Sequence, residues 1–61
     1  LTPIQYLQNL RIEKAKYLLE TTNRNVETIT YDVGYQDINS FRRLFKERLH
    51  ISPSLYRKKF Q

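Results

Sequence analysis

Four polar side chains share one side of a helix that the spacing of apolar residues predicts over residues 37–49. At 100° per residue they span an arc about 100° wide. This arc lies to one side of the apolar positions Phe41, Phe45 and Leu49. An arginine guanidinium pairs with O6 and N7 of guanine, and an asparagine amide pairs with N6 and N7 of adenine. The arc therefore suits the reading of DNA base edges, although an ordinary solvated basic face shows the same pattern. Its members are Asn39, Arg42, Arg43 and Lys46.

The other charged residues near this arc have more general interpretations. Asp37 comes directly before the helix and is expected to cap its N-terminus rather than to contact a base. Lys46 lies deeper in the helix and is expected to contact a phosphate. Arg57 and Lys58, in the basic run near the C-terminus, are predicted to contact phosphates as well, and a plain solvated run fits them equally well. Phosphate contacts strengthen binding but carry no sequence information.

The excess of positive charge lies entirely in the second half of the chain. The 61 residues carry a formal net charge of +5. Residues 1–34 hold four basic and four acidic residues, which sum to zero, whereas residues 35–61 hold seven basic and two acidic residues, which sum to +5. Such an asymmetry indicates a polyanionic partner, and nucleic acid fits better than a membrane.

Several classes of function lack the residues that they need. The chain has no cysteine and one histidine, His50, so neither a disulfide nor a metal site is expected. We expect no cofactor and no enzymatic activity, because no nucleophile stands with a base and an orienting group, and no glycine-rich loop could cradle a phosphate. No run approaches the roughly 20 apolar residues of a membrane span, and a cytoplasmic location is expected. The chain opens with Leu1 rather than methionine, which indicates part of a longer protein.

Helix start and stop signals predict an all-α fold of four helices. A long first helix occupies residues 1–21, with Thr2 as its cap and a proline after it. A helix-turn-helix follows over residues 25–49, in which Gly34 ends the second helix because glycine accepts a left-handed backbone. A short C-terminal helix spans residues 52–60. The expected architecture is a single homeodomain-like subdomain in which the first helix packs on the helix-turn-helix.

The first helix carries two apolar stripes rather than one. On one face, expected to pack on the rest of the chain, lie Ile4, Leu7, Ile12, Ala15, Leu18 and Leu19. On nearly the opposite face lie Tyr6, Leu10 and Tyr17. This second stripe indicates a helix wedged between two packed units, and tyrosines lying on the surface explain it about equally well. Arg11 falls within the first stripe and is expected to have a structural role.

Apolar residues flank Gly34 at the spacing of a helix-turn-helix. Ile29, Val33 and Tyr35 lie five residues before it, one before it and one after it. The next buried position is expected at Phe41, so the turn is one residue longer than in the minimal motif. In this motif the second helix enters the major groove of DNA. Many helical bundles contain a similar corner, so the spacing alone is a moderate signal.

Five segments of the chain resemble AraC/XylS-type bacterial transcription regulators. PIQYL at residues 3–7 and LRIEKAKYLL at residues 10–19 are similar to the central linker helix of that family. VETITYDVGY at residues 26–35, SFRRLFK at residues 40–46 and SPSLYR at residues 52–57 are similar to its second helix-turn-helix. The longer turn is also a feature of the family, and the match covers nearly the whole chain.

The resemblance implies a DNA-binding domain of two helix-turn-helix units joined by the long helix. This chain would hold the bridging helix and the second unit, and the stripe of Tyr6, Leu10 and Tyr17 would contact the missing N-terminal unit. Double-stranded DNA is the implied partner, RNA polymerase is a further one, and the bacterial nucleoid is the implied location. The positions that correspond to the family's base-reading residues are Ile38, Asn39, Arg42 and Arg43.

Two residues depart from the pattern of the family. Thr30 stands where alanine is frequent, at the crossing of the two short helices, and its methyl group can be accommodated. His50 stands where glycine is usual, between the third and fourth helices. On a left-handed backbone, a histidine costs on the order of 1 kcal/mol relative to glycine.

A helical protein-interaction module is the alternative from another class of function. It would dock on a polymerase subunit or a partner domain through the second stripe of the first helix or through the basic helix. A membrane-surface role for the C-terminal segment has less support, because that segment lacks a broad apolar face. Binding to duplex DNA that weakens steeply with salt would favour the DNA-binding interpretation.

Overall fold

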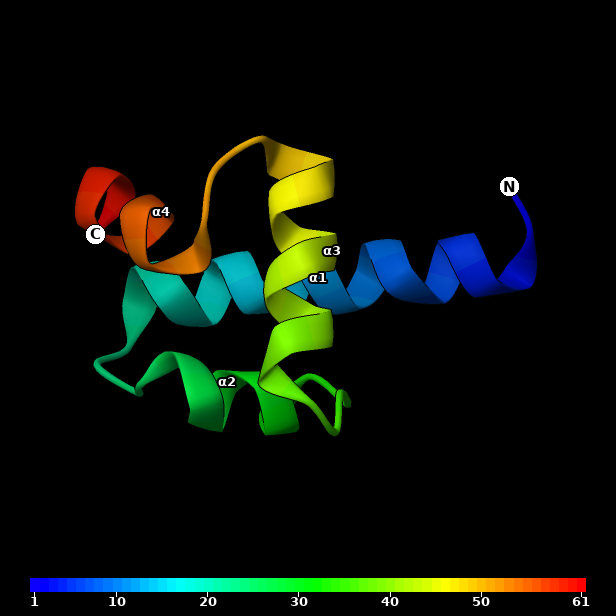
Figure 1. Ribbon diagram of the computed structural model, residues 1–61. Coiled ribbons are helices and arrows are strands. Elements are labelled where there is room, and N and C mark those ends of the chain that lie inside the picture. The colour runs from blue at the N-terminus through cyan, green and yellow to red at the C-terminus, as the bar shows by residue number, and fades with distance from the viewer.

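Four α-helices make up the computed structural model, which describes residues 1–61 (Figure 1). α1 spans Pro3–Thr21, α2 Val26–Asp32, α3 Ile38–Leu49 and α4 Pro53–Phe60. There are no strands. The predicted all-α fold is confirmed. Each helix boundary lies within two residues of its prediction, which is the scatter that fraying helix ends normally show. No helix combines the length and the hydropathy that a membrane crossing requires.

Each helix begins at a side chain that satisfies amides of its first turn. The Oγ1 atom of Thr2 accepts from the amide of Gln5, and the Gln5 side chain accepts in return from the amide of Thr2, both at 3.1 Å. This capping box pairs two donors that α1 itself cannot satisfy. Asn25 caps α2 and Ser52 caps α4 through a single bond each. The capping bonds that begin these helices join residues three apart in the sequence, so each depends on nearby residues alone.

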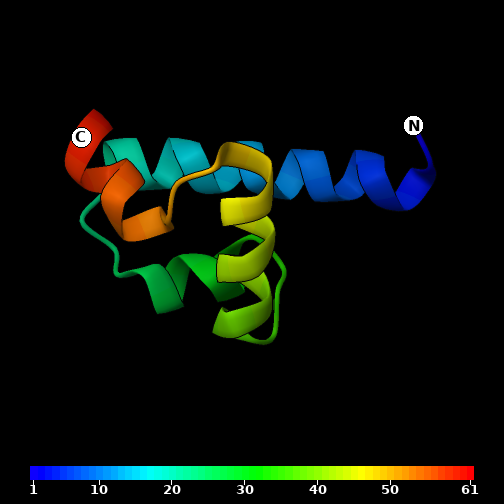
Figure 2. The ribbon, with the colours of Figure 1, turned by 45° about the horizontal axis from the view of Figure 1, so that its top comes forward.

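α1 is the longest element and lies along one side of the molecule (Figures 1 and 2). α3 crosses it, while α2 and α4 pack against the part of α1 that follows the crossing. The first turns of α1 extend past α3 on the other side, and the N-terminus lies at the end farthest from α4. α3 packs mainly on α2 and α4.

A row of aromatic rings runs through the centre of the molecule, from the turn before α3 to the end of α4. Neighbouring ring centroids lie between 4.7 and 5.8 Å apart, at which tilted and edge contacts are favourable. Phe41 and Phe45 are completely buried in the middle of the row. The rings belong to Tyr35, Phe41, Phe45, Tyr56 and Phe60. Around them pack Ile12, Ala15, Leu18 and Leu19 of α1, Ile29 of α2 and Val33.

The predicted core stripe of α1 is buried only in its C-terminal part. Ile4 and Leu7 are 70% and 46% exposed, although they lie on the same stripe as the buried residues. The prediction that these two residues face the bundle is wrong for this chain. α1 continues beyond α3, and no other element lies against its first turns (Figure 2). A helical period gives the face on which a residue lies, but not how far along that face a packing partner extends.

α4 is held against the C-terminal end of α1 by polar contacts. The hydroxyl of Tyr56 donates to the carboxylate of Glu20. The guanidinium of Arg57 donates to the carbonyls of Leu19 and Thr22, at 3.2 and 3.1 Å. Carbonyls at a helix C-terminus lack intrahelical partners, and a cation there is favourable. Burial of the phenol, together with its bond to Glu20, raises the pKa of Tyr56 to about 12.

Candidate nucleic-acid interface

α3 presents an exposed polar face at positions three or four residues apart. Residues at these spacings lie on the same side of an α-helix. The side chains of Asn39, Arg42, Arg43 and Lys46 are all exposed, and none makes a hydrogen bond or an ion pair within the chain. Ile38, at the start of the helix beside them, is half-buried. The structure thus leaves two guanidinium groups, an amide and an ammonium group available together on one face.

The remaining four of the six arginines have partners inside the protein. Arg24 pairs with a carboxylate, and Arg48 bonds to two amide side chains. Arg57 bonds to two backbone carbonyls, and Arg11 lies over an aromatic ring. Arg42 and Arg43 are therefore the two arginines that are free to bind an external group. A free guanidinium on a rigid helix presents its donors in a fixed planar fork.

Asp37 fixes the start of α3 and therefore the direction of its first side chains. Its carboxylate accepts from the amides of Asn39 and Ser40, at 3.3 and 3.2 Å, and from the hydroxyl of Ser40 at 2.9 Å. The hydroxyl bond first, and then the amide bonds, lower the pKa of Asp37 below its ordinary value of 3.8. Asp37 is thus a charged N-cap, with its acceptors turned towards the helix.

Gly34 suits the turn between α2 and α3 because of its backbone conformation and the close approach of a side chain. Its φ of +105° is a conformation that L side chains rarely adopt. A Cβ atom at this position would also lie 3.1 Å from Nε of Arg11. Arg11 in turn lies over the ring of Tyr35, 5.1 Å from its centroid, as a cation–π contact. Arg11 therefore has a structural role in the turn.

Of the two departures from the family pattern, Thr30 is accommodated, whereas His50 adopts a backbone conformation that favours glycine. Thr30 is completely buried, and its hydroxyl donates to the carbonyl of Val26 at 2.8 Å, so no polar atom is left unpaired. His50 has φ 60° and ψ 23°, a left-handed backbone, and its amide donates to the carbonyl of Lys46 at 2.7 Å. The histidine therefore occupies the conformation for which glycine is favoured.

The candidate phosphate contacts do not share one environment. Lys46 and Lys58 are exposed and have no partner within the chain. Arg57 is half-buried, and two of its nitrogen atoms donate to carbonyls of α1 and of the residues after it. Part of the Arg57 guanidinium is therefore engaged within the chain, and a phosphate contact by Arg57 stays a prediction.

A second exposed surface lies on α1, away from the core. Tyr6, Leu10 and Tyr17 are 58%, 50% and 64% exposed. No other element of the chain covers these side chains. With Ile4 and Leu7, Tyr6 and Leu10 cover an arc of about 160° around the first half of α1. This exposed arc is wider than a stripe that packs on a single neighbour along one edge.

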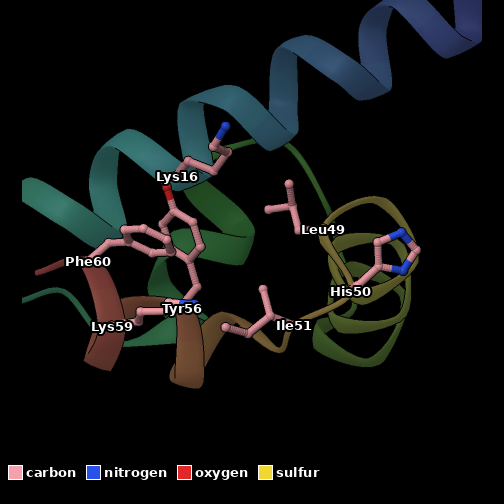
Figure 3. Close-up of a pocket in the computed structure, with 7 residues that line it drawn as sticks. All are labelled: Lys16, Leu49, His50, Ile51, Tyr56, Lys59 and Phe60. Atoms are coloured by element: carbon pink, nitrogen blue, oxygen red, sulfur yellow. The ribbon is translucent and has the colours of Figure 1, made fainter.

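A hollow of about 560 Å³ opens where α1, α4 and the turn after α3 meet (Figure 3). The rings of Tyr56 and Phe60 lie side by side along one edge, and Leu49 and Ile51 line the opposite edge (Figure 3). Lys16, which also lines it, is paired with a glutamate of α1 at 2.8 Å. The hollow lies at the C-terminal end of α3, apart from the polar face. No group of three or more side chains in the chain could hold a metal ion.

Sequence reasoning assigned no role to Arg48, which the structure places between α3 and α1. Arg48 follows Lys46 by two residues and therefore lies about 200° around the helix from it. Its guanidinium donates to the side-chain oxygens of Gln8 and Asn9. The position of Arg48 on the helical wheel could have indicated a contact inside the protein, because it lies away from the polar face of the same basic helix.

Comparison with known proteins identifies the family. Residues 1–59 match the family described as a helix-turn-helix domain. The chain belongs to the AraC/XylS-type helix-turn-helix family. The predicted family is confirmed, and so is the prediction of a DNA-binding helix-turn-helix from a bacterial transcription regulator.

Curated relatives and a solved structure agree with this assignment. The MmsAB operon regulatory protein of Pseudomonas aeruginosa is 41% identical over 58 residues, which cover 95% of this chain and 19% of that protein. The raffinose operon transcriptional regulatory protein of Pediococcus pentosaceus is 44% identical over 57 residues, which cover 93% and 21%. The C-terminal domain of a two-component response regulator from Fusobacterium nucleatum superposes with a TM-score of 0.91 at 40% identity, over 93% of this chain and 55% of that one. The chain thus spans about a fifth of the length of these curated relatives.

Proposed function

We propose that α3 enters the major groove of double-stranded DNA and reads base edges with Asn39, Arg42 and Arg43. Ile38 lies beside them and supplies an apolar contact of the kind that recognises a thymine methyl group. The observation that carries the proposal is that these polar groups are exposed on one face and have no partner within the chain. The second helix of a helix-turn-helix is the element that enters the groove.

Lys46 and Lys58 contact phosphates in this arrangement and supply affinity that falls with salt. Lys46 extends the polar face along α3, and Lys58 stands on α4. Asp37 makes no base contact, because its carboxylate is committed to the helix start. With one reading helix, the 61-residue chain alone is expected to bind DNA weakly, with a Kd of roughly 10⁻⁴–10⁻⁶ M.

Arg43→Ala tests the base-reading role. A duplex is first selected from a random pool by the unaltered chain, and binding to it and to random DNA is then measured by fluorescence anisotropy. The substitution should narrow the difference in binding free energy between the two duplexes by about 1–3 kcal/mol, because one bidentate contact is lost. Equal weakening on both duplexes would show that Arg43 contacts the backbone instead.

Lys46→Ala separates a phosphate contact from a base contact. It should weaken binding to both duplexes about equally and reduce the slope of log K against log salt by about 0.9. Lys14→Ala is the matched control, since it removes the same charge from an exposed position of α1. If Lys14→Ala and Lys46→Ala have the same effect, the binding depends on net charge and not on α3.

The exposed stripe of Tyr6, Leu10 and Tyr17 is proposed to contact a first helix-turn-helix unit of the same regulator. The support is its exposure in this chain, together with the greater length of the relatives. In a longer piece of the parent protein, acrylamide should quench the fluorescence of these tyrosines less than in the 61-residue chain. Unchanged quenching would favour the alternative, a docking surface for another protein such as RNA polymerase.

A further inference from the structure

The backbones of α3 and α1 approach each other at few points, although side chains of both helices belong to the same apolar core. α3 packs mainly on α2 and α4, and α1 packs mainly on the same two helices. In both ribbon views α3 crosses α1, and the first half of α1 extends beyond the crossing (Figures 1 and 2). The angle between the reading helix and the long helix therefore depends on the shared core and on the polar side chains that join the two helices.

Arg48 joins the two helices near the C-terminal end of α3. Its guanidinium donates to Oε1 of Gln8 at 2.9 Å and also to Oδ1 of Asn9. These are the side-chain hydrogen bonds that link α3 to α1 in this structure. Because a guanidinium is a rigid planar fork, two bonds to successive residues fix the rotation as well as the distance of the helix that carries it.

The other end of α3 is tied to α1 in a different way. Arg11 of α1 lies over the ring of Tyr35, in the turn that leads into α3. That ring lies 5.8 Å from the ring of Phe41, inside α3 itself. Two arginines thus tie the turn before α3 and the end of α3 to α1, and neither points towards the polar face.

We infer that Arg48 is a positioning residue for base reading, which acts through Gln8 and Asn9 and makes no contact with DNA. This inference rests on the proposed role of α3. Bidentate pairing requires donors and acceptors to meet in one plane, so a helix that can rock about its crossing point loses base contacts before it loses phosphate contacts. Arg48 therefore contributes to the choice between sequences rather than to affinity for DNA in general.

Arg48→Met tests this inference, because methionine keeps an unbranched stem and has no hydrogen-bond donor. A correct bidentate pair discriminates between bases by roughly 5- to 150-fold, and a misplaced one retains part of this. We expect Arg48→Met to lower the ratio of the binding constants for the selected duplex and for random DNA about 10-fold. The slope of log K against log salt should stay unchanged. Lys14→Met is the matched control for the lost charge and should leave the ratio unchanged. A salt slope reduced by about 0.9, with equal weakening on both duplexes, would overturn the inference and make Arg48 a phosphate contact.

A double-mutant cycle then tests the route through α1. Gln8→Ala combined with Asn9→Ala should lower the ratio as much as Arg48→Met does. In that background, Arg48→Met should cause no further loss, because the partners are already gone. A full additional loss would show that Arg48 acts on something other than these residues and would overturn the inference. If Arg48→Met alone proves poorly folded by circular dichroism, the variant with Gln8→Ala and Asn9→Ala tests the inference by itself, and an unchanged ratio in it overturns the inference.

A distance measurement reports the positioning without DNA. The chain has no cysteine, so spin labels can be placed at Ile4→Cys on α1 and Glu47→Cys on α3. The distance distribution between the labels should broaden in Arg48→Met and not in Lys14→Met. An unchanged distribution would overturn the inference. If the unaltered chain prefers no duplex from the pool, the proposed function fails, whereas selective binding that Arg48→Met leaves intact refutes only the role of Arg48.

Discussion

Replacing His50 by glycine should stabilise the protein, although it removes a large side chain. His50 ends α3 with φ 60° and ψ 23°, and its side chain is exposed and makes no hydrogen bond. A left-handed backbone costs a residue with a Cβ atom about 1–2 kcal/mol relative to glycine. Glycine also gives the unfolded chain more freedom, which offsets about 0.4–1 kcal/mol of that gain. The expected net increase in the free energy of unfolding is therefore about 0.5–1 kcal/mol.

The expected change in Tm follows from the size of the chain. Unfolding entropy near 60 °C is about 2.1 cal/mol/K per residue, which gives about 0.13 kcal/mol/K for a domain of this length. A stabilisation of about 0.5–1 kcal/mol thus corresponds to a rise in Tm of roughly 4–8 °C. Thermal unfolding followed by circular dichroism at 222 nm measures such a shift directly.

Two control variants separate the backbone from the side chain. His50→Ala removes the imidazole but keeps a Cβ atom on the left-handed backbone, so it should not raise Tm. Gly34→Ala makes the opposite change at the other left-handed position, where φ is +105°, and should lower Tm. If His50→Gly leaves Tm unchanged, or if His50→Ala raises it as much, backbone strain at His50 is not the cause.

Two further predictions concern polar groups near the turn. The hydroxyl of Tyr35 is buried without a hydrogen-bond partner. Tyr35→Phe should therefore raise the free energy of unfolding, measured by urea titration, by about 1 kcal/mol. A loss of stability would reveal a partner for that hydroxyl. The lowered pKa of Asp37 means that its contribution to stability is present above pH 3.8 and is lost as the pH falls through the folded-state pKa. Because the Ser40 hydroxyl is the main cause, Ser40→Ala should raise the pKa of Asp37 towards 3.8 in a nuclear magnetic resonance titration, and an unchanged pKa would assign the shift to the backbone amides alone.

The helix boundaries could be predicted because the contacts that set them are local. Thr2 and Gln5 form the capping box of α1, and Asp37 bonds to amides two and three residues ahead. Gly34 ends α2 through its own backbone conformation. Each of these signals lies within a few residues of the boundary that it sets, so the sequence contains the whole interaction.

The contacts between distant parts of the chain could not be predicted in the same way. Arg57 was grouped with Lys58 as a surface cation, but it bonds to carbonyls that lie 35 and 38 residues earlier. Arg48 reaches α1 across a similar separation. A helical wheel gives the direction of such a side chain relative to its own helix, but the element that meets it depends on how the helices cross.

Positive charge has two separate effects in this chain, and the arginines divide between them. Arg11, Arg48 and Arg57 are engaged by a ring, by amide oxygens and by carbonyl oxygens, all of which are uncharged. Their charges are therefore not cancelled, and they still contribute to the field that a polyanion meets within about a Debye length of 8–10 Å. However, Arg48 and Arg57 each donate two hydrogen bonds within the chain, and the guanidinium of Arg11 lies over a ring. The field thus comes from most of the basic residues, whereas bidentate pairing of an arginine with guanine requires a guanidinium without a partner in the chain, as at Arg42 and Arg43.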